Sequence, residues 1–399
     1  MKVGPLFGFW IDPATKNINS FVTPNKTADS SDETCDDDCS LREAFTATSP
    51  SEILYLPEGV YTLTEGELLI DKSLIMLGAG PGKTIIQAAE NLDASTHRVL
   101  NVTSSNVTIS GVTIRHGKAT AEKVDVGRDQ PALAAGYGQE GGGIFINRGQ
   151  LHLDNSLVEV NAAGRGGIFN HFGELTLTHS TVAANLAQER CPCSGGGIQN
   201  RLGAVTVEWT TISGNESSGS GGAIYNNTLA SDPMNLMNIT ISGNTADSDG
   251  GGIVSSTSGG RLMIVNGTIS DNHFRAHGGG IFTIDFGTAN PQGPDIVNTV
   301  VAGNTAATGP DCFGTITSLG HNLLESSDRC TLTLTVGDIV EVAPLLGPLT
   351  DNGGRTLTHA LLPESAAIGA GDDSYARDDD QRGINRPQGL ATDIGAYEK

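Results

Sequence analysis

A glycine-rich repeat limits the possible folds of this chain more than any other feature of its sequence. Through the middle of the 399 residues, a Gly-Gly-x or Gly-Gly-Ile segment recurs at intervals of 24 to 30 residues. The isoleucine that marks each segment stands at Ile144, Ile168, Ile198, Ile224, Ile253 and Ile281. Self-similarity at a period of about 20 to 50 residues is typical of solenoids and other repeat architectures.

Each repeat contains short runs of alternating, β-branched residues and no pattern of helical period. The segment from Glu174 to Thr178 alternates polar and apolar residues, and a segment like Thr-Ile-Ser-Gly-Asn ends several repeats. The Gly and Asn residues between the runs tolerate the positive φ angles of tight turns. One repeat cannot bury its apolar face alone, so successive repeats must stack as rungs about 4.8 Å apart. The sequence therefore predicts an all-β fold, a single-stranded parallel β-helix.

A second anchor of the repeat is an asparagine at one fixed place in each rung. These residues are Asn161, Asn185, Asn215, Asn244, Asn272 and Asn304. Stacked amides can hydrogen-bond to one another and to turn backbone groups that would otherwise be buried unpaired. We therefore expect an internal amide ladder.

The repeat divides the chain into three parts. Residues 51–344 carry the rungs, the earliest of them irregular. Before them, Ser40-Leu-Arg-Glu43 has the spacing of a capping box, which predicts a short helix that covers the first open rung within an N-terminal cap, residues 1–50. Residues 345–399 lose the period and carry Asp and Gly clusters, which indicates an irregular C-terminal cap.

The six cysteines fall into close pairs. The candidate disulfide partners are Cys35 with Cys39, Cys191 with Cys193, and Cys312 with Cys330. Close pairing and an even number favour an oxidising compartment, hence a secreted or cell-surface protein. Free thiols are the alternative for Cys191 and Cys193, because a bond between them would be strained. No stretch approaches the roughly 18 apolar residues that span a bilayer, so we expect no transmembrane segment.

These features together resemble known extracellular families. Cys39-Ser-Leu-Arg-Glu-Ala44 is similar to the CSLREA domain at the start of secreted bacterial β-helix proteins. The stretches 346–355, 380–383 and 393–397 resemble the choice-of-anchor Q domain. The repeats between them resemble rungs of pectate-lyase-like and polymorphic outer-membrane proteins. The resemblance covers nearly the whole chain and implies a right-handed β-helix in a surface protein, in families mostly without an assigned chemistry.

The charge of the chain bears on its partners. A formal net charge of −22 disfavours nucleic acid, because binding to phosphates depends on clustered cations. The acidic run that includes Asp36, Asp37 and Asp38 is a candidate for structural calcium, which takes several carboxylate or carbonyl oxygens. A solvated acidic loop is the alternative interpretation.

A column of aromatic side chains follows the Gly-Gly-Ile segments. Counting from each isoleucine, the candidate substrate-binding residues are Phe145, Arg148, Phe169, Tyr225 and Phe282. If the isoleucines point inward, alternation along the strand places these residues on one outer face. Flat rings there could stack on the pyranoses of an extracellular glycan, and Arg could bind acidic sugars. A shift of one residue would instead send every ring into the core.

An enzymatic role is the alternative to binding. In the lyases that the chain resembles, an Arg, Lys, His or Tyr removes the proton α to a uronate carboxylate, and calcium or Arg stabilises the charge that develops. His171, Arg201 and Tyr225 lie on consecutive predicted rungs and are the candidate catalytic residues. Hydrolysis needs two carboxylates at matched places on nearby rungs, and Asp285 on one rung does not align with Asp249 or Asp271 in the turns.

Two functions from different classes are thus predicted. The first is an extracellular or cell-surface protein, adhesin or stalk-like, that binds polysaccharide along a lateral face. The second is a polysaccharide lyase that cleaves an acidic polysaccharide by β-elimination, with a glycoside hydrolase as a third possibility.

Overall fold

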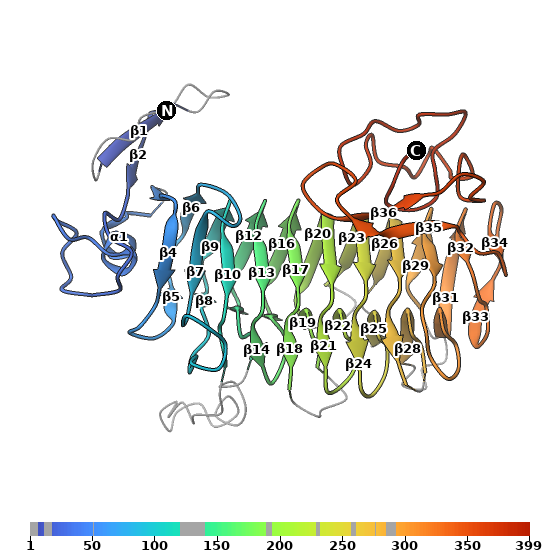
Figure 1. Ribbon diagram of the computed structural model, residues 1–399, viewed down its shortest axis with the longest axis horizontal. Helices are drawn as coiled ribbons and strands as arrows, with labels where there is room; N and C mark the ends of the chain where they lie inside the picture. The colour runs from blue at the N-terminus through green and yellow to red at the C-terminus, as the bar shows by residue number, and fades with distance from the viewer. Residues whose placement is uncertain are drawn as a thin grey trace.

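The computed structural model describes residues 7–11, 18–50, 52–119, 140–188, 194–228, 232–256, 261–275, 277–284 and 293–399. These residues wind into an elongated coil whose strands stack side by side along its length (Figure 1). Neighbouring rungs pair in parallel, as in β11 (Ile144–Asn147) with β15 (Ile168–His171). The predicted right-handed parallel β-helix is confirmed.

The rungs contribute strands to three long faces that run along the coil, and five of the described rungs also contribute to one short ladder. The first face contains β5 (Leu68–Ile70), β8 (Leu100–Thr103), β11, β15, β19 (Ile198–Arg201), β22 (Ile224–Asn227), β25 (Ile253–Ser256) and β28 (Ile281–Ile284). The second contains β3 (Ile53–Leu56), β6 (Leu74–Gly78), β9 (Asn106–Ser110), β12 (Gln150–Asp154), β16 (Glu174–Thr178), β20 (Ala204–Ser213), β23 (Met234–Ser242), β26 (Leu262–Ser270), β29 (Asp295–Val297), β31 (Cys312–Gly320) and β33 (Cys330–Thr333).

The third face begins with β4 (Gly59–Thr62), β7 (Thr84–Gln87), β10 (Thr113–Arg115), β13 (Leu157–Glu159) and β17 (Thr181–Ala183), continues through the second halves of β20, β23 and β26, and ends with β30 (Val300–Ala302), β32 (Leu323–Leu324) and β34 (Ile339–Val340). The short ladder consists of β14 (Ala162–Ala163), β18 (Leu186–Ala187), β21 (Glu216–Ser217), β24 (Thr245–Ala246) and β27 (His273–Phe274).

Alternation along the strands separates the core from the surface. On β12, Leu151 and Leu153 are buried in one continuous core, whereas Gln150, His152 and Asp154 are exposed or half-buried. The same pattern recurs on β9 and β16. The isoleucines of the repeat, from Ile144 to Ile281, all belong to this core and are fully buried. Their inward direction fixes which side chains of each strand can reach the surface.

The predicted amide ladder runs through the interior. All six of its asparagines are buried. The Nδ2 of each one donates to the Oδ1 of the next at 2.9–3.0 Å, from Asn161 to Asn304. Each Oδ1 from Asn185 onward also accepts the backbone N–H of the preceding ladder residue. The ladder ends on Asp311, whose Oδ1 accepts from Asn304 at 3.0 Å, and burial raises the pKa of Asp311 to about 6.

A second, shorter ladder was not expected from the sequence. Asn170 donates to Asn200 and Asn200 to Asn226, both at 2.9 Å, on the inward side of the first face. All three side chains are buried. Each follows a core isoleucine by two residues, a position that alternation assigns to an apolar side chain.

The paired glycines make room for the first ladder. Gly166 has a φ of +69°, a conformation that favours glycine. At Gly167, an added Cβ would lie 2.4 Å from Cγ of Asn185, so only glycine lets this turn approach the amides. The Gly-Gly segments are therefore needed because the turn backbone packs directly against the buried amides of the ladder.

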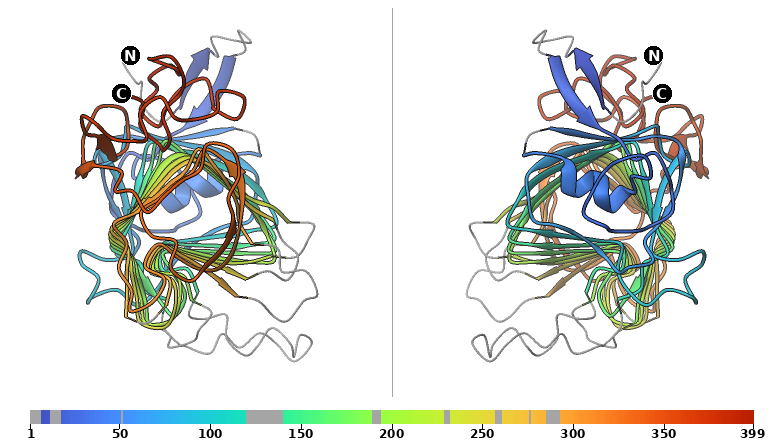
Figure 2. Two further views of the ribbon diagram at one scale, coloured as in Figure 1. Left: turned by 90° about the vertical axis from the view of Figure 1, so that its right-hand side faces the viewer. Right: turned by 90° about the vertical axis from the view of Figure 1, so that its left-hand side faces the viewer.

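The N-terminal end of the coil carries the predicted helix. The helix α1 (Leu41–Ala47) lies across the open end of the first rungs, as the right-hand view of Figure 2 shows. Ser40 Oγ accepts from the backbone N–H of Glu43 at 3.2 Å, and Glu43 Oε2 accepts from the N–H of Ser40 at 2.6 Å, which confirms the capping box. A hairpin of β1 (Phe7–Ile11) and β2 (Ile18–Val22) precedes it, and β2 joins β3 in parallel.

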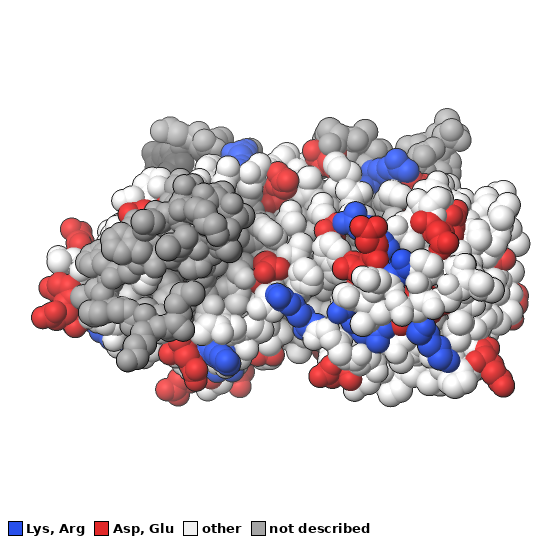
Figure 3. Space-filling model, turned by 90° about the horizontal axis from the view of Figure 1, so that it is seen from above, with Lys and Arg blue, Asp and Glu red and all other residues white. Residues whose placement is uncertain are grey.

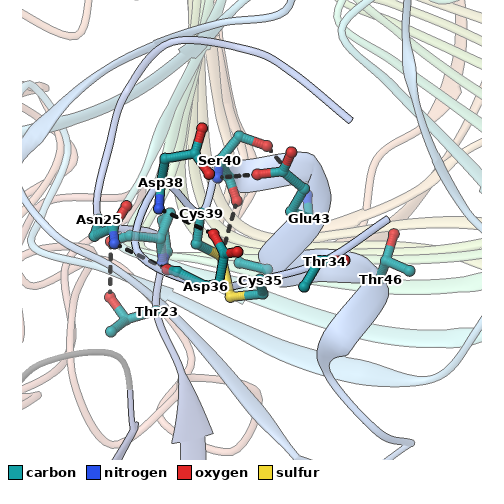
Figure 4. Close-up of a disulfide and its surroundings, with 12 residues drawn as sticks. Thr23, Asn25, Thr34, Cys35, Asp36, Asp38, Cys39, Ser40, Glu43 and Thr46 are labelled. Atoms are coloured by element: carbon teal, nitrogen blue, oxygen red, sulfur yellow. Dashed lines mark hydrogen bonds between the residues drawn. A yellow bond between two sulfur atoms is a disulfide. The ribbon is translucent and has the colours of Figure 1, made fainter. Parts of the chain in front are cut away.

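Two of the three predicted disulfides are confirmed. Cys35 is bonded to Cys39 beside α1 (Figure 4), and Cys312 is bonded to Cys330 between the last rungs. Cys191 and Cys193 lie outside the described residues. Within the described residues, no helix is both long and apolar enough to cross a bilayer.

Residues 345–399 lie on the flank of the coil, over the strands from β20 to β32 (Figure 1). They include the antiparallel pair β35 (Leu346–Thr350) and β36 (Thr358–Leu361). Leu361, Ala367 and Ile394 pack with core residues of β30 and β32 in a second apolar cluster. Polar contacts reinforce the docking: Thr240 Oγ1 donates to Gln381 Oε1 at 2.7 Å, and Asn238 Nδ2 donates to the Asp379 carbonyl at 2.8 Å.

The amide ladder gives a direct test of what holds the rungs together. Asn215→Ala removes the acceptor for Asn185 and the donor to the Val182 carbonyl, and it leaves both groups buried. Because each buried unpaired polar group costs about 1–3 kcal/mol, we expect a loss of about 3 kcal/mol or more in the free energy of unfolding. The control is Asn235→Ala on the outward side of β23, where we expect a change within about 0.5 kcal/mol. Equal urea denaturation curves for the two variants would contradict a structural role for the ladder.

Candidate functional site

The predicted catalytic residues lie on the outward side of the first face, but only two of them are aligned. His171 on β15 stands in register with Arg201 on β19. Tyr225 on β22 pairs with Gln199, and the residue in register with Arg201 is Asn227. Tyr225 therefore lies two positions away along its strand. The structure brings His171 and Arg201 together and offsets the tyrosine.

His171 is enclosed by aromatic and cationic groups. Its side chain is 1% exposed. The imidazole stacks on Phe169 with the ring centres 5.9 Å apart, and it meets the edge of Phe172 at 4.5 Å. Burial, together with the nearby charges of Arg201, Arg148 and Arg165, lowers the pKa of His171 to about 4. The imidazole is therefore neutral at neutral pH.

The aromatic column has the predicted register. Phe145, Phe169, Gln199, Tyr225, Val254 and Phe282 succeed one another on neighbouring strands, outside the main core. Phe145 is 6% exposed, Phe169 0% and Tyr225 5%, so a glycan cannot stack on these three rings in this conformation. Burial also raises the pKa of Tyr225. Phe282 is half-buried and stacks on Phe313 with the ring centres 5.4 Å apart.

Two adjoining hollows open beside this column. The first, of about 310 Å³, lies over the second face and is lined by Ser73, Leu74, Ile75, Asn106, Val107, Thr108, Gln150, Leu151, His152, Glu174 and Thr176. The second, of about 280 Å³, lies at the corner between the first and second faces and is lined by Arg148, Gly149, Gln150, Phe172, Gly173, Glu174, Leu202, Gly203, Ala204 and Asp232. Gln150 and Glu174 line both, so we call the two hollows together the trough.

The corner end of the trough is built from a repeated turn. Arg148, Phe172 and Leu202 occupy the same place on three successive rungs, each with a positive φ between +51° and +58°. This turn directs Arg148 and Phe172 to the surface: Arg148 is exposed, and Phe172 is 46% exposed. The guanidinium of Arg148 lies 5.7 Å from the centre of the Phe172 ring. The turn thus presents a cation and an aromatic ring side by side.

A charged cluster that the sequence analysis missed lies at the far edge of the second face. Asp154, Thr178 and Glu208 stand in register on β12, β16 and β20. Thr178 Oγ1 donates to Asp154 Oδ1 at 2.8 Å, whereas Glu208 pairs with Arg377 of the C-terminal residues at 2.5 Å. Figure 3, viewed from the side of the C-terminal residues, shows basic and acidic side chains interspersed on its right half.

The same edge carries a stack of rings. His179 lies parallel to Trp209 at a centre-to-centre distance of 5.0 Å, and Trp209 Nε1 donates to Asp379 Oδ1 at 3.0 Å. Because Asp154 contacts Thr178 and Glu208 pairs with Arg377, both carboxylates of this edge are already engaged in contacts within the protein. Only strand register could have revealed this cluster, because the spacing between rungs varies from 24 to 30 residues.

The acidic run near the N-terminus has local partners. Asp36, Asp37 and Asp38 are exposed, and Lys26 Nζ contacts Asp38 Oδ2 at 2.8 Å, which lowers the pKa of that carboxyl. Among the described residues, no three His, Cys, Asp or Glu side chains come together in a way that could hold a metal ion. Calcium at this run stays a prediction.

Comparisons with known proteins place the fold. Neither models of protein families nor curated sequences give a match to this chain. The crystal structure of pectate lyase Pel9A superposes with a TM-score of 0.58 at 14% identity, over 95% of this chain and 96% of that one. A pectin methylesterase mutant in complex with a hexasaccharide gives a TM-score of 0.29 at 10% identity, over 78% and 81% of the two chains.

A mannuronic-acid-specific lyase of polysaccharide family 6 from human gut microbiota gives a TM-score of 0.24 at 10% identity, over 72% and 78% of the chains. At 14% identity, the pectate lyase bears on the fold alone. The chain therefore has the parallel β-helix fold of this pectate lyase.

Proposed function

We propose that this protein binds an acidic polysaccharide in the lateral trough, as an extracellular or cell-surface protein. The observation that carries the proposal is a pair of cations on a strongly acidic chain. Arg148 follows and Arg201 ends the strands on either side of the His171 strand, Arg148 lines the corner hollow, and neither arginine forms an ion pair with another described residue. In a chain of net charge −22, such uncompensated arginines favour a carboxylate ligand.

The shape of the trough supports a chain-like ligand. The hollow over the second face crosses β6, β9, β12 and β16. Four rungs span about 14 Å along the coil, because neighbouring strands are about 4.8 Å apart. Phe172 and Ile75, 46% and 37% exposed, offer apolar surface to the faces of sugar rings. Hydroxyl and amide groups between them can bond sugar hydroxyls.

The ends of the chain fit an extracellular setting. We propose that residues 1–50 act as a cap of the CSLREA type and that residues 345–399 are a choice-of-anchor Q-like unit. Support comes from the helix α1 across the first rungs and from the docked C-terminal residues. The disulfides Cys35–Cys39 and Cys312–Cys330 support secretion, since disulfides persist in oxidising compartments.

β-Elimination is the second candidate function. A neutral imidazole is the form that can accept a proton, and Arg201 stands next to it in register. However, the imidazole is only 1% exposed and packs against the rings of Phe169 and Phe172, so a substrate cannot reach it in this conformation. Burial of His171 therefore favours binding over elimination.

The binding proposal predicts a charge-dependent affinity. Replacement of Arg148 and Arg201 by Ala removes both cations, and a charge-assisted hydrogen bond contributes about 1.5–3 kcal/mol. We expect the double variant to bind polygalacturonate, alginate or hyaluronan at least about tenfold more weakly in titration calorimetry. Arg329→Ala, at an arginine that is 63% exposed near the end of the coil, is the control. Unchanged affinity of the double variant, or no binding of any polyuronate by the natural protein, would contradict the proposal.

The elimination alternative predicts a new unsaturated sugar. Incubation with the same polyuronates should raise ultraviolet absorbance, and His171→Gln should abolish the rise while leaving glycan binding intact. We expect no rise, because His171 is enclosed. A rise that depends on His171 would establish the lyase and overturn this expectation.

The environment of His171 also predicts a pH dependence of stability. Its pKa of about 4 in the folded protein lies below the ordinary value of 6.5, so between these values the unfolded chain binds the extra proton. Stability therefore falls as pH drops through this window, by about 2–3 kcal/mol between pH 7 and 4.5. In His171→Gln this part of the loss should vanish, as measured by urea denaturation at the two pH values. The exposed His273 gives the control, His273→Gln. If both variants lost the same stability between pH 7 and 4.5, the assignment of this pH dependence to His171 would be refuted.

A further inference from the structure

The polar lining of the trough changes along its length. At the corner end, Arg148 supplies a positive charge and Asp232 a negative one. Where the two hollows meet, Glu174 is exposed, and its Oε2 accepts a hydrogen bond from Gln150 Nε2 at 2.9 Å. Beyond this point, the other polar side chains that line the hollow carry no formal charge apart from the titratable His152: Ser73, Asn106, Thr108, Gln150 and Thr176.

This pattern does not match a uniformly charged ligand. A homopolymer of uronic acid that reaches from Arg148 into the first hollow must pass a carboxylate close to Glu174. The carboxylate of the ligand and the carboxylate of Glu174 would repel each other, and the net charge of −22 on the protein adds to this repulsion. A chain with neutral sugars at these places avoids the penalty and still offers a carboxylate to Arg148 at the corner end. Selectivity of this kind comes from repulsion of the wrong ligand as much as from attraction of the right one.

We propose, on the basis of the function above, that the trough selects a polysaccharide in which acidic sugars are separated by neutral ones, and that Glu174 is the residue that determines this specificity. The bond from Gln150 holds the carboxylate at the junction of the two hollows. The neutral hydroxyl and amide groups of the first hollow bind the sugars that follow. Apolar surface from Ile75, 37% exposed, lies in the same hollow.

Methyl esterification tests the proposal, because it changes the charge density of a polyuronate without changing its backbone. Galacturonan and alginate are each prepared as free acid, half methyl ester and full methyl ester. Titration calorimetry should show that the half ester binds at least about threefold more tightly than the free acid at low salt. The full ester should bind most weakly, because it offers no carboxylate to the arginines.

The variant Glu174→Gln identifies the residue responsible. Removal of the carboxylate should raise affinity for the free acid about three- to tenfold and leave the half ester nearly unchanged. Glu216→Gln, at an exposed glutamate of β21 that lines neither hollow, is the matched control and should behave like the natural protein.

The outcomes separate this inference from the proposed function. If the natural protein binds the free acid best and Glu174→Gln changes nothing, the inference is overturned while binding of acidic glycan stands. The same holds if Glu216→Gln raises affinity as much as Glu174→Gln, since the effect would then reflect overall charge. If no form of either polymer binds, both the proposed function and the inference are contradicted.

Discussion

Stacking of rungs in register is the constraint on which the rest of this structure depends. A coil of short strands leaves many polar turn groups in its interior, and each unpaired one would cost stability. The asparagine ladder from Asn161 to Asn304 pairs several of these groups and ties each rung that it crosses to the next with two bonds. Because side chains alternate between core and surface, a slip of one residue would turn every outward column inward. The trough exists only while this register holds.

The sequence predicts the elements whose cause is local or periodic. The repeat of Gly-Gly-Ile and Asn shows the coil and its ladder directly, and the spacing of Ser40 and Glu43 shows the helix cap. The second ladder, at Asn170 and its neighbours, could not be foreseen, because a polar residue at an inward position resembles a defect in the pattern. Its partners become visible only when strands are paired.

The candidate site shows the limit of alternation as a guide. Alternation along the strand places Phe169 on the outward side of β15. It does not predict what packs against that side, and the ring is fully buried. The sequence groups Tyr225 with Arg201 because the two lie on consecutive predicted rungs, whereas strand pairing sets Asn227 opposite Arg201. Turn conformation decides what reaches the surface: the left-handed corner exposes Arg148 and Phe172.

Binding and chemistry on this scaffold depend on columns assembled from distant parts of the chain. In the function that we propose, the arginines bind a carboxylate, the enclosed imidazole stays neutral, and Glu174 limits the charge density of the ligand nearby. A crystal structure with a bound oligouronide tests this account most directly. We expect the sugar chain to lie across the corner with a carboxylate within hydrogen-bond distance of Arg148 or Arg201. A chain bound on another face, or no bound chain at saturating concentration, would contradict it.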